Sequence, residues 1–388
     1  MKVVPLGEIS RIVSGATPKT GVADYWDGDI QWATPADLSK LDGPYIAETP
    51  RTLTDAGAKS CATSVLPAGS VLLSSRAPIG HVAINTVPMA TNQGFKSLVP
   101  GPDLDAKYLY HWLKSKTAYL QSLGNGATFK ELSKKTTEQV LVPLPAIPEQ
   151  RRIAAILDRA DAIRAKRRQV LAHLDALTQS NFHDLFGTPE DWLQRWPMGT
   201  IGDLAEDVAY GTSGKAGGKG AWPILRMGNV TDDGRLDLTD LKYIDLSPVD
   251  VPKYTVRRGD MLFNRTNSKE KVGKAAVVRT DQPLALAGYL VRVRFADVAT
   301  AEFVAGYLAS PHGVAVRQKL AKAAVNQANI SASEMRKIEI AHPPLAAKRS
   351  YAASLDAIEA ERAVVLRALA ADKELFASLQ SRAFRGEL

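Results

Sequence analysis

The sequence predicts an α+β fold in which two mixed α/β domains are separated by a pair of long helices that form an antiparallel coiled coil. Three observations support this fold: an internal repeat, two long amphipathic segments, and short strand-like runs between them. A chain of 388 residues is long enough for more than one core. We expect a first domain at 1–147, a first spacer helix at 148–186, a second domain at 187–342 and a second spacer helix at 343–388.

The internal repeat relates the two halves by a pseudo-two-fold symmetry. A shift of 198 residues superposes the region from about 128 to 186 on the region from about 326 to 384. Upstream, "AGSVLLSSR" (68–76) resembles "RGDMLFNRT" (258–266), and "AKYLYHWLKS" (106–115) resembles "AEFVAGYLAS" (301–310). Matched pairs along the shift include Ser133 with Ser331, Arg151 with Arg349, Leu157 with Leu355, Asp158 with Asp356, and Phe186 with Phe384.

The two long amphipathic segments carry apolar residues at alternating spacings of three and four, which is the pattern of a coiled coil. Pro148 suits the first helical position, and Gly187 is a suitable stop. Arg167, Arg362 and Asp372 interrupt the stripes, and charges there can fix the register or meet helices of another protein. The expected contact positions are Ile153, Ile156, Ile163, Val170, Leu174 and Leu177 in the first helix and Leu355, Ile358, Val365, Leu369, Phe376 and Leu379 in the second.

Each preceding region reads as a small mixed domain. Strand-like runs such as "GSVLLSS" and "HVAINTV" in the first half, and "GDMLFN" and "KAAVVR" in the second, are separated by Gly and Pro turns. Helices are expected near 105–123 and 300–321, after the strands. The segment "FGTPEDWLQRWPMG" (186–199) has the prolines and glycines of a domain boundary.

The composition is that of an ordinary globular protein, with 45% hydrophobic and 23% charged residues. No signal peptide or membrane span is recognisable, so the expected location is the cytoplasm. Cys61 is the only cysteine, which excludes an internal disulfide. The net charge of +8 is compatible with a polyanionic partner, and the excess gathers between the long helices, at 107–135, 257–279 and 317–337.

Motifs for catalysis are missing from the sequence. The loop "GTSGKAGGKG" (211–220) lacks the spacing of a phosphate-binding loop, and no Ser or Thr follows its lysines. "HPPL" (342–345) only superficially resembles the Asn-Pro-Pro-aromatic motif of amino-methyltransferases, because His replaces the amide. The six histidines have no second ligand at metal-binding spacing. We therefore expect no cofactor and no metal in this chain, and a reader or scaffold instead of an enzyme.

Several segments resemble a known family. "PLPAIPEQRRIAAILDRADAIRAKR" (143–167) is similar to the central conserved helix of the specificity subunit of type I restriction and modification enzymes. "SGATPKTGVADYWDGDIQWATPADLSK" (14–40) and "TNQGFKSLVP" (91–100) resemble its first target-recognition domain, and "GDMLFNRTNS" (259–268) resembles a second. The resemblance covers nearly the whole chain. The second long helix departs from it, because Ala347 and Lys348 replace the Glu-Gln of the family motif.

This resemblance implies that each domain reads one half of a bipartite, asymmetric double-stranded DNA target. The chain would be non-catalytic. Two methylation subunits would dock on it, bring S-adenosylmethionine and methylate adenine, and restriction subunits would add cleavage driven by ATP with Mg²⁺. A helix of 149–185 is roughly 55 Å long, more than the roughly 35 Å between half-sites one DNA turn apart, so the helices could set the spacing.

Candidate DNA contacts are polar or basic residues on loops, because Arg pairs with guanine and Asn or Gln with adenine. The candidates in the first half are Thr17, Lys19, Thr20, Arg76, Asn92, Gln93, Phe129 and Lys130. Those in the second half are Arg226, Asn229, Asn264, Arg265, Asn267, Lys269, Lys271, Asn326 and Gln327.

Two alternatives remain open from the sequence. The chain could be a coiled-coil adaptor that binds only proteins, or the specificity subunit of a type II system with a fused restriction and methylation partner. The basic clusters between the helices favour a DNA reader over the adaptor.

Overall fold

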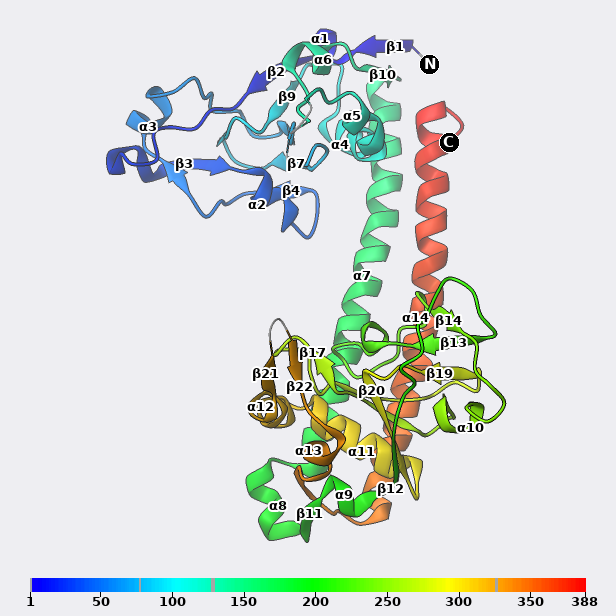
Figure 1. The fold of residues 1–388 in the computed structure, drawn as a ribbon. Helices are drawn as coiled ribbons and strands as arrows, with labels where there is room; N and C mark the ends of the chain where they lie inside the picture. Colours follow the sequence, from blue (N-terminus) through cyan, green and yellow to red (C-terminus); the bar gives the residue numbers. More distant parts are fainter. Residues whose placement is uncertain (1, 77, 127–129, 325–326) are drawn as a thin grey trace. The chain divides into compact units, whose positions relative to one another are not determined.

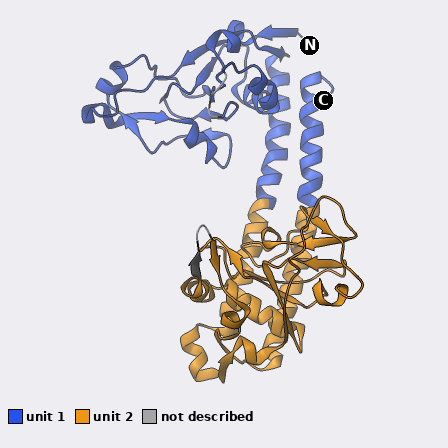
Figure 2. Cartoon of the chain, viewed as in Figure 1, with its two compact units in different colours: residues 1–167, 368–388 blue, residues 168–367 orange. Residues whose placement is uncertain are grey.

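The computed structural model describes residues 2–76, 78–126, 130–324 and 327–388 (Figure 1). The chain divides into two compact units (Figure 2): residues 1–167 with 368–388, and residues 168–367. Each unit therefore contains a mixed domain and part of each long helix, whereas the sequence was divided into four successive segments. None of the described helices is long and apolar enough to cross a membrane.

Unit 1 is built on two sheets and a strand pair. A five-stranded sheet has the order β2-β9-β6-β7-β4, a three-stranded sheet has the order β5-β3-β8, and β1 pairs with β10. The strands are β1 (Lys2–Pro5), β2 (Ser10–Ser14), β3 (Trp26–Ala33), β4 (Tyr45–Ile46), β5 (Thr52–Leu53), β6 (Val71–Leu73), β7 (Val82–Asn85), β8 (Met89–Thr91), β9 (Lys96–Pro100) and β10 (Leu141–Leu144). The helices other than the long pair are α1 (Leu6–Ile9), η1 (Ala23–Tyr25), α2 (Pro35–Ser39), α3 (Asp55–Lys59), α4 (Ala106–Ser115), α5 (Thr117–Ser122) and α6 (Lys134–Glu138).

Unit 2 contains three small sheets and a strand pair, with the orders β12-β20-β16-β18, β14-β13-β19-β15, β17-β22-β21 and β11-β23. The strands are β11 (Met198–Thr200), β12 (Ala205–Tyr210), β13 (Trp222–Leu225), β14 (Lys242–Ile244), β15 (Thr255–Val256), β16 (Met261–Asn264), β17 (Thr266–Asn267), β18 (Ala275–Val277), β19 (Leu284–Leu286), β20 (Leu290–Phe295), β21 (Lys322–Ala324), β22 (Gln327–Asn329) and β23 (Glu339–Ala341). The helices are α8 (Pro189–Arg195), α9 (Ile201–Leu204), η2 (Met227–Asn229), α10 (Val251–Tyr254), α11 (Val298–Ala309), α12 (Pro311–Leu320) and α13 (Ala332–Arg336).

The internal repeat is present in the fold. The antiparallel run β2-β9-β6 of unit 1 corresponds to β12-β20-β16 of unit 2, and the parallel pair β3·β8 corresponds to β13·β19. The cores also match, because the edge-to-face contact of Tyr108 with Phe384 has its equivalent in Phe303 with Phe186. Both units are therefore versions of one domain, and each packs its own portions of the two long helices.

The long helices are α7 (Ile147–Phe186) and α14 (Leu345–Arg385). Within unit 1, Arg167 is ion-paired with Asp372, and the Arg164 guanidinium lies 4.4 Å from the ring centre of Phe376. Within unit 2, Arg362 is 3.3 Å from Asp175. Positions that rise along α7 meet positions that fall along α14, so the two helices pack antiparallel in each unit, as predicted. Gly187, with φ of +68°, follows the last turn of α7.

The expected contact positions on α14 are buried or half-buried, whereas those on α7 range from buried to exposed. Leu355, Ile358, Val365 and Leu369 are buried, and Phe376 and Leu379 pack against the core of unit 1. On α7, Ile153 is buried and Ile156 and Leu174 are half-buried. The remaining predicted positions of α7 are exposed, with 49% of Ile163, 42% of Val170 and 51% of Leu177 accessible.

The buried face of α7 lies one residue later than predicted. It runs through Leu157, Arg164, Leu171, Asp175 and Phe182. The charged members are paired, since Arg164 lies 3.0 Å from Asp161 and Asp175 lies 2.8 Å from Arg235. A charge can face a helix partner when it is paired there. The prediction had placed Arg167 in the stripe, and Arg167 does pair with Asp372, but it had not placed Arg164 and Asp175 at the contact.

Candidate nucleic-acid interface

In unit 1, four chain segments meet at one end of the five-stranded sheet. The segment after β2 is joined to the end of β8 by a hydrogen bond from the Ala16 amide to the Thr91 carbonyl, of 3.0 Å. The Ser75 amide donates to the Gly94 carbonyl at 2.7 Å, and the Leu132 amide donates to the Ser75 carbonyl at 2.9 Å. Loops that are far apart in the sequence therefore form one surface, and they carry most of the candidate residues.

The side chains of this surface are polar donors and acceptors. Thr17 and Gln93 are in contact through Oγ1 and Oε1, although they lie 76 residues apart. Asn92 accepts a hydrogen bond from the Gly94 amide at 2.8 Å, which fixes the turn that presents Gln93. A Cβ at Gly15 would lie 2.0 Å from the Asn92 carbonyl oxygen, so this close approach requires glycine. The remaining candidates here, Lys19, Thr20 and Lys130, are exposed.

Arg76 belongs to a charge cluster at the same end of the sheet. Its guanidinium lies 3.9 Å from the Glu131 carboxylate, which also binds the ammonium of the nearly buried Lys96 at 3.2 Å. Two cations around one carboxylate leave a local excess of positive charge, with Arg76 the more accessible of the two. The sequence reading missed Lys96, which lies in a strand that reads as core. Phe129 lies outside the described residues.

Unit 2 repeats this backbone arrangement with different side chains. The Thr212 amide donates to the Leu286 carbonyl at 2.8 Å, the Arg265 amide to the Tyr289 carbonyl at 3.1 Å, and the Ile330 amide to the Arg265 carbonyl at 2.9 Å. These three bonds are the equivalents of those in unit 1. Arg265 thus takes the place of Ser75, at the centre of the loop cluster.

One aromatic ring lies against the Arg265 guanidinium, and a second exposed tyrosine belongs to the same loop cluster. Its guanidinium lies 4.9 Å from the ring centre of Tyr210, and Tyr210 and Tyr289 are 44% and 51% exposed. Neither tyrosine was predicted as a DNA contact, because a tyrosine at a strand end is expected to lie in the core. Their solvent exposure identifies them as candidates, and it is known only from the structure. Exposed rings beside a guanidinium can stack on bases or sugars.

Three predicted residues of unit 2 form hydrogen bonds that stabilise the segment 226–240 from its buried side. Asn229 is buried, accepts a hydrogen bond from the Arg226 amide at 2.9 Å and donates to the Asp237 carbonyl at 2.8 Å. The Arg226 guanidinium donates to the Asp240 carbonyl at 3.0 Å. Asn264 is fully buried and donates to the Met227 carbonyl at 3.1 Å. The expectation that Asn229 and Asn264 contact DNA is therefore wrong, because the sequence shows the amide but not its burial.

Several cations of the basic cluster at 257–279 are neutralised by ion pairs within unit 2. Four of its cations have carboxylate partners: Arg257 with Asp260, Arg258 with Asp281, Lys274 with Asp232, and Arg279 with Glu302. Within the described part of the chain, Arg265, Lys269 and Lys271 have no ion pair. A hydrogen bond from its own backbone amide lowers the pKa of the exposed Glu270, with Lys269 and Lys271 adding to the effect, so this carboxylate is ionised. Lys269 and Lys271 follow Arg265 of the loop cluster closely in the sequence.

The remaining candidates of unit 2 lie on the hairpin side of the surface. Asn267 is half-buried and accepts a hydrogen bond from the Ser268 amide at 2.9 Å, while Gln327 is exposed on β22, which pairs with β17. Asn326 is outside the described residues. Among the residues that the structure covers, no three His, Cys, Asp or Glu side chains are grouped to hold a metal ion.

Comparison with known proteins agrees with this organisation. Residues 1–173 match the family model described as type I restriction modification DNA specificity domain. The MjaIX specificity subunit of a type I restriction enzyme from Methanocaldococcus jannaschii is 37% identical over 186 residues, which cover 47% of this chain and 43% of that relative. The EcoKI specificity subunit from Escherichia coli strain K12 is 24% identical, over all of this chain and 89% of the relative.

Solved structures show the same fold. A chain from a type I R-M system gives a TM-score of 0.61 at 18% identity, covering 100% of this chain and 98% of the other. The S subunit of a type I restriction-modification system from M. genitalium gives 0.57 at 14% identity, covering 99% and 96%. The chain spans less than half the length of the MjaIX relative but most of the EcoKI relative.

Proposed function

Starting from a chain whose residues 1–173 belong to the DNA specificity domain family of type I restriction-modification systems, we propose that it is the DNA-recognition subunit of such a system. The resemblance noted in the sequence is confirmed by the alignments along the whole chain. Each unit would read one half of a bipartite target in double-stranded DNA. The chain itself would recognise and not catalyse.

One observation carries this proposal: both units use the same backbone frame to present a loop cluster, but with unlike side chains. Unit 1 presents Thr17, Gln93 and Arg76, whereas unit 2 presents Arg265 with two exposed tyrosines. Base edges are read by side-chain donors and acceptors, so unlike side chains on a common frame select unlike half-sites. The target is therefore expected to be asymmetric.

Partners of the chain follow from the same proposal. Two methylation subunits would bring S-adenosylmethionine and methylate an adenine in each half-site, and restriction subunits with ATP and Mg²⁺ would add cleavage. The complex would act in the cytoplasm, where the DNA is. Support comes from the exposed stripe Ile163, Val170 and Leu177 on α7, which recurs every seven residues and suits a partner helix.

The helix pair is proposed to set the distance between the half-sites. α7 and α14 have 40 and 41 residues and each contributes to both units. A change in helix length would alter both the separation and, because DNA is helical, the rotation at which two half-sites are accepted.

The test is a footprint of the purified chain with its methylation partner on a library of duplexes. We expect protection of one bipartite sequence and an affinity that falls steeply with salt, because phosphate contacts release counterions. Absence of any sequence-dependent protection would rule out the proposal. An adaptor that binds only proteins would not bind DNA, and the two loop clusters argue against it. A type II system would instead have a neighbouring gene that encodes a fused restriction and methylation protein.

A further inference from the structure

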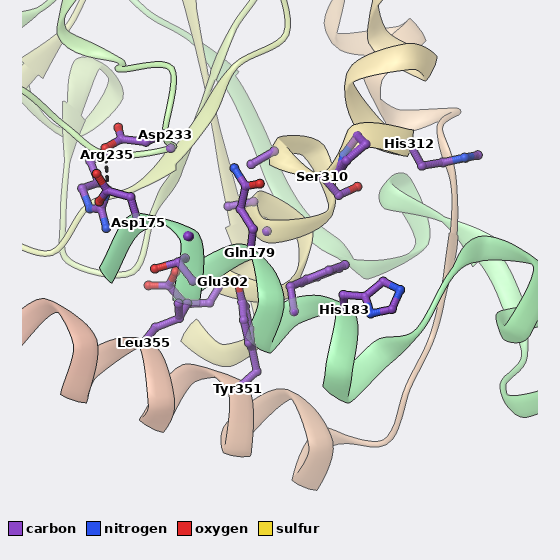
Figure 3. A pocket seen from close by; sticks show the side chains of 18 of the residues that line it. Asp175, Gln179, His183, Asp233, Arg235, Glu302, Ser310, His312, Tyr351 and Leu355 are labelled. Carbon is purple, nitrogen blue, oxygen red and sulfur yellow. Dashed lines mark hydrogen bonds and ion pairs between the residues drawn. The ribbon is translucent and has the colours of Figure 1, made fainter. Parts of the chain in front are cut away.

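Unit 2 contains a cavity of about 410 Å³ between α7, α14, α11 and the loop at 233–235 (Figure 3). Its apolar wall includes Phe182, Trp192 and Tyr351, and its polar wall includes Asp175, Glu302 and Glu359. All lining residues belong to unit 2, and none is a candidate DNA contact. The DNA-reading surface therefore leaves this cavity unexplained.

The internal repeat shows how the cavity arises. Ala305 and Gly306 of α11 take the places of Tyr110 and His111 of α4. In unit 1 both rings are buried, and His111 Nε2 lies 2.7 Å from Asp158 Oδ1. In unit 2 the equivalent of Asp158 is Asp356, whose side chain is 80% exposed. In unit 2 the place of the His111 ring is taken by Tyr351 and Phe182, which a Cβ at Gly306 would meet at 2.6 and 2.8 Å, so only the place of Tyr110, beside Ala305, is left to the cavity.

A tyrosine hydroxyl at the cavity has no partner within the described residues. Tyr351 is only 2% exposed and replaces Ile153 of unit 1. A Cβ at Gly306 would lie 2.6 Å from Tyr351 Oη, so the ring is accommodated by the glycine. Figure 3 shows Tyr351 reaching from α14 to the cavity, on the same side as Glu302. The hydroxyl lines the cavity and is therefore available to a ligand there.

The polar wall is acidic in a chain that is basic overall. Arg235 lies 2.8 Å from Asp175 and 2.6 Å from Glu359, and Arg279 lies 2.7 Å from Glu302. Asp233 also lines the cavity, and Arg362, which is not part of the lining, lies 3.3 Å from Asp175 and 3.9 Å from Asp233, so four carboxylates are set against three guanidinium groups. The formal charge of the lining is negative, with the histidines neutral. An anion is disfavoured in such a cavity, and a cation is favoured.

We propose that this cavity is a binding site for an organic cation that carries an amidinium, guanidinium or amine on an apolar body. The N–H groups would donate to the carboxylates and to Tyr351 Oη, and the body would pack on Phe182 and Trp192, in the place that the ring of Tyr110 fills in unit 1. The cation is either a free small molecule or an arginine side chain of a protein partner.

The test is calorimetric titration of the full chain with benzamidinium, and with neutral benzamide and anionic benzoate as shape-matched controls. Benzamidinium is expected to bind, benzamide about tenfold more weakly, as for the loss of a charged hydrogen bond, and benzoate not at all. Equal binding of benzamide, or no binding of benzamidinium, would overturn the proposal.

Two variants locate the site. Ala305→Tyr inserts the residue of unit 1 and is expected to abolish binding, whereas Tyr351→Phe keeps the cavity shape and is expected to weaken binding about fivefold through one lost hydrogen bond. Leu193→Ala, at an exposed residue of α8 that does not line the cavity, is the matched control and should bind as the parent does. Unchanged binding by Tyr351→Phe would contradict the assignment even if Ala305→Tyr failed to fold.

Addition of the methylation partner distinguishes the two sources of the cation. If a partner arginine fills the cavity, the partner displaces benzamidinium; if a free molecule fills it, benzamidinium still binds. The site is independent of the proposed DNA recognition, so a footprint measured on the same variants should not change.

Discussion

The register of α7 is testable by comparing two alanine substitutions on the same helix. Leu157 is fully buried in the core of unit 1, together with Tyr108 and Ala383, whereas Ile163 is half exposed. Truncation of a buried leucine to alanine typically costs about 2–5 kcal/mol, because burial is lost and a cavity remains. Truncation of an exposed side chain changes stability by less than about 0.5 kcal/mol.

We therefore expect Leu157→Ala to lower the free energy of unfolding of unit 1 by about 3 kcal/mol. In a unit of this size that corresponds to a fall in Tm of roughly 6–12 °C. Urea unfolding, followed by circular dichroism and by hydrogen exchange of α7 amides, measures the effect. Ile163→Ala is the matched control and should leave unfolding unchanged.

A reversed order would refute the register. If Ile163→Ala destabilised as strongly as Leu157→Ala, the apolar heptad positions would face α14 after all, and the paired charges would lie outside. Loss of the methylation partner from Ile163→Ala with normal stability would instead support the proposed role of the exposed stripe.

Four further predictions concern unit 1, unit 2 and their DNA contacts. Burial lowers the pKa of His111 below 6.5, although the hydrogen bond to Asp158 opposes this shift. The unfolded chain therefore binds more protons than the folded chain, and the stability of unit 1 should fall as pH drops below 6.5. His111→Gln should flatten this pH dependence of the unfolding free energy, measured in urea titrations. Arg235→Ala leaves Glu359 without its cation and Asp175 with Arg362 alone, and should destabilise unit 2 by about 1.5–3 kcal/mol, the range for lost hydrogen bonds to charged groups. Arg258→Ala, at an exposed pair, should cost less than about 1 kcal/mol by denaturant unfolding. Tyr289→Ala should weaken target binding by about 1–3 kcal/mol in a filter assay if the ring stacks on a base, and parental affinity would remove it from the interface. Lys271→Ala should weaken binding to all duplexes alike and lower the salt slope by about one; a sequence-dependent loss would contradict a phosphate contact.

The repeat is what made the fold predictable. One constant shift aligned the two long helices, and the strands before them aligned with small insertions. The fold reproduces this repeat down to the ring pairs Tyr108–Phe384 and Phe303–Phe186. Antiparallel packing followed from connectivity, because a whole domain separates two helices that bury stripes. The register on α7 did not follow. Asp175 is acceptable at the contact only through Arg235, a partner 60 residues away, and the pairing of Arg164 with the neighbouring Asp161 does not by itself show which face of the helix is buried.

The candidate interface was predictable in place but not in detail. The polar residues of unit 1 do gather at one end of a sheet, since turns with Asn and Gly mark the loops. In unit 2, Asn229 and Asn264 have the chemistry of base readers but bind backbone carbonyls in the interior. Tyr210 and Tyr289, by contrast, were expected in the core but are exposed, because they lie at strand ends that only the fold defines. The cavity of unit 2 follows from Ala305 and Gly306, and it becomes visible only when the two units are compared.

The central claim is that the two units read separate halves of one DNA target. The most direct measurement is a genome-wide map of modified adenines in cells carrying the parent gene, the Arg265→Ala and Tyr289→Ala double variant of unit 2, or no gene. We expect one bipartite motif that depends on the gene and that relaxes in a single half in the variant. Modified adenines that are unaffected by loss of the gene, or a motif that changes in both halves together, would contradict it.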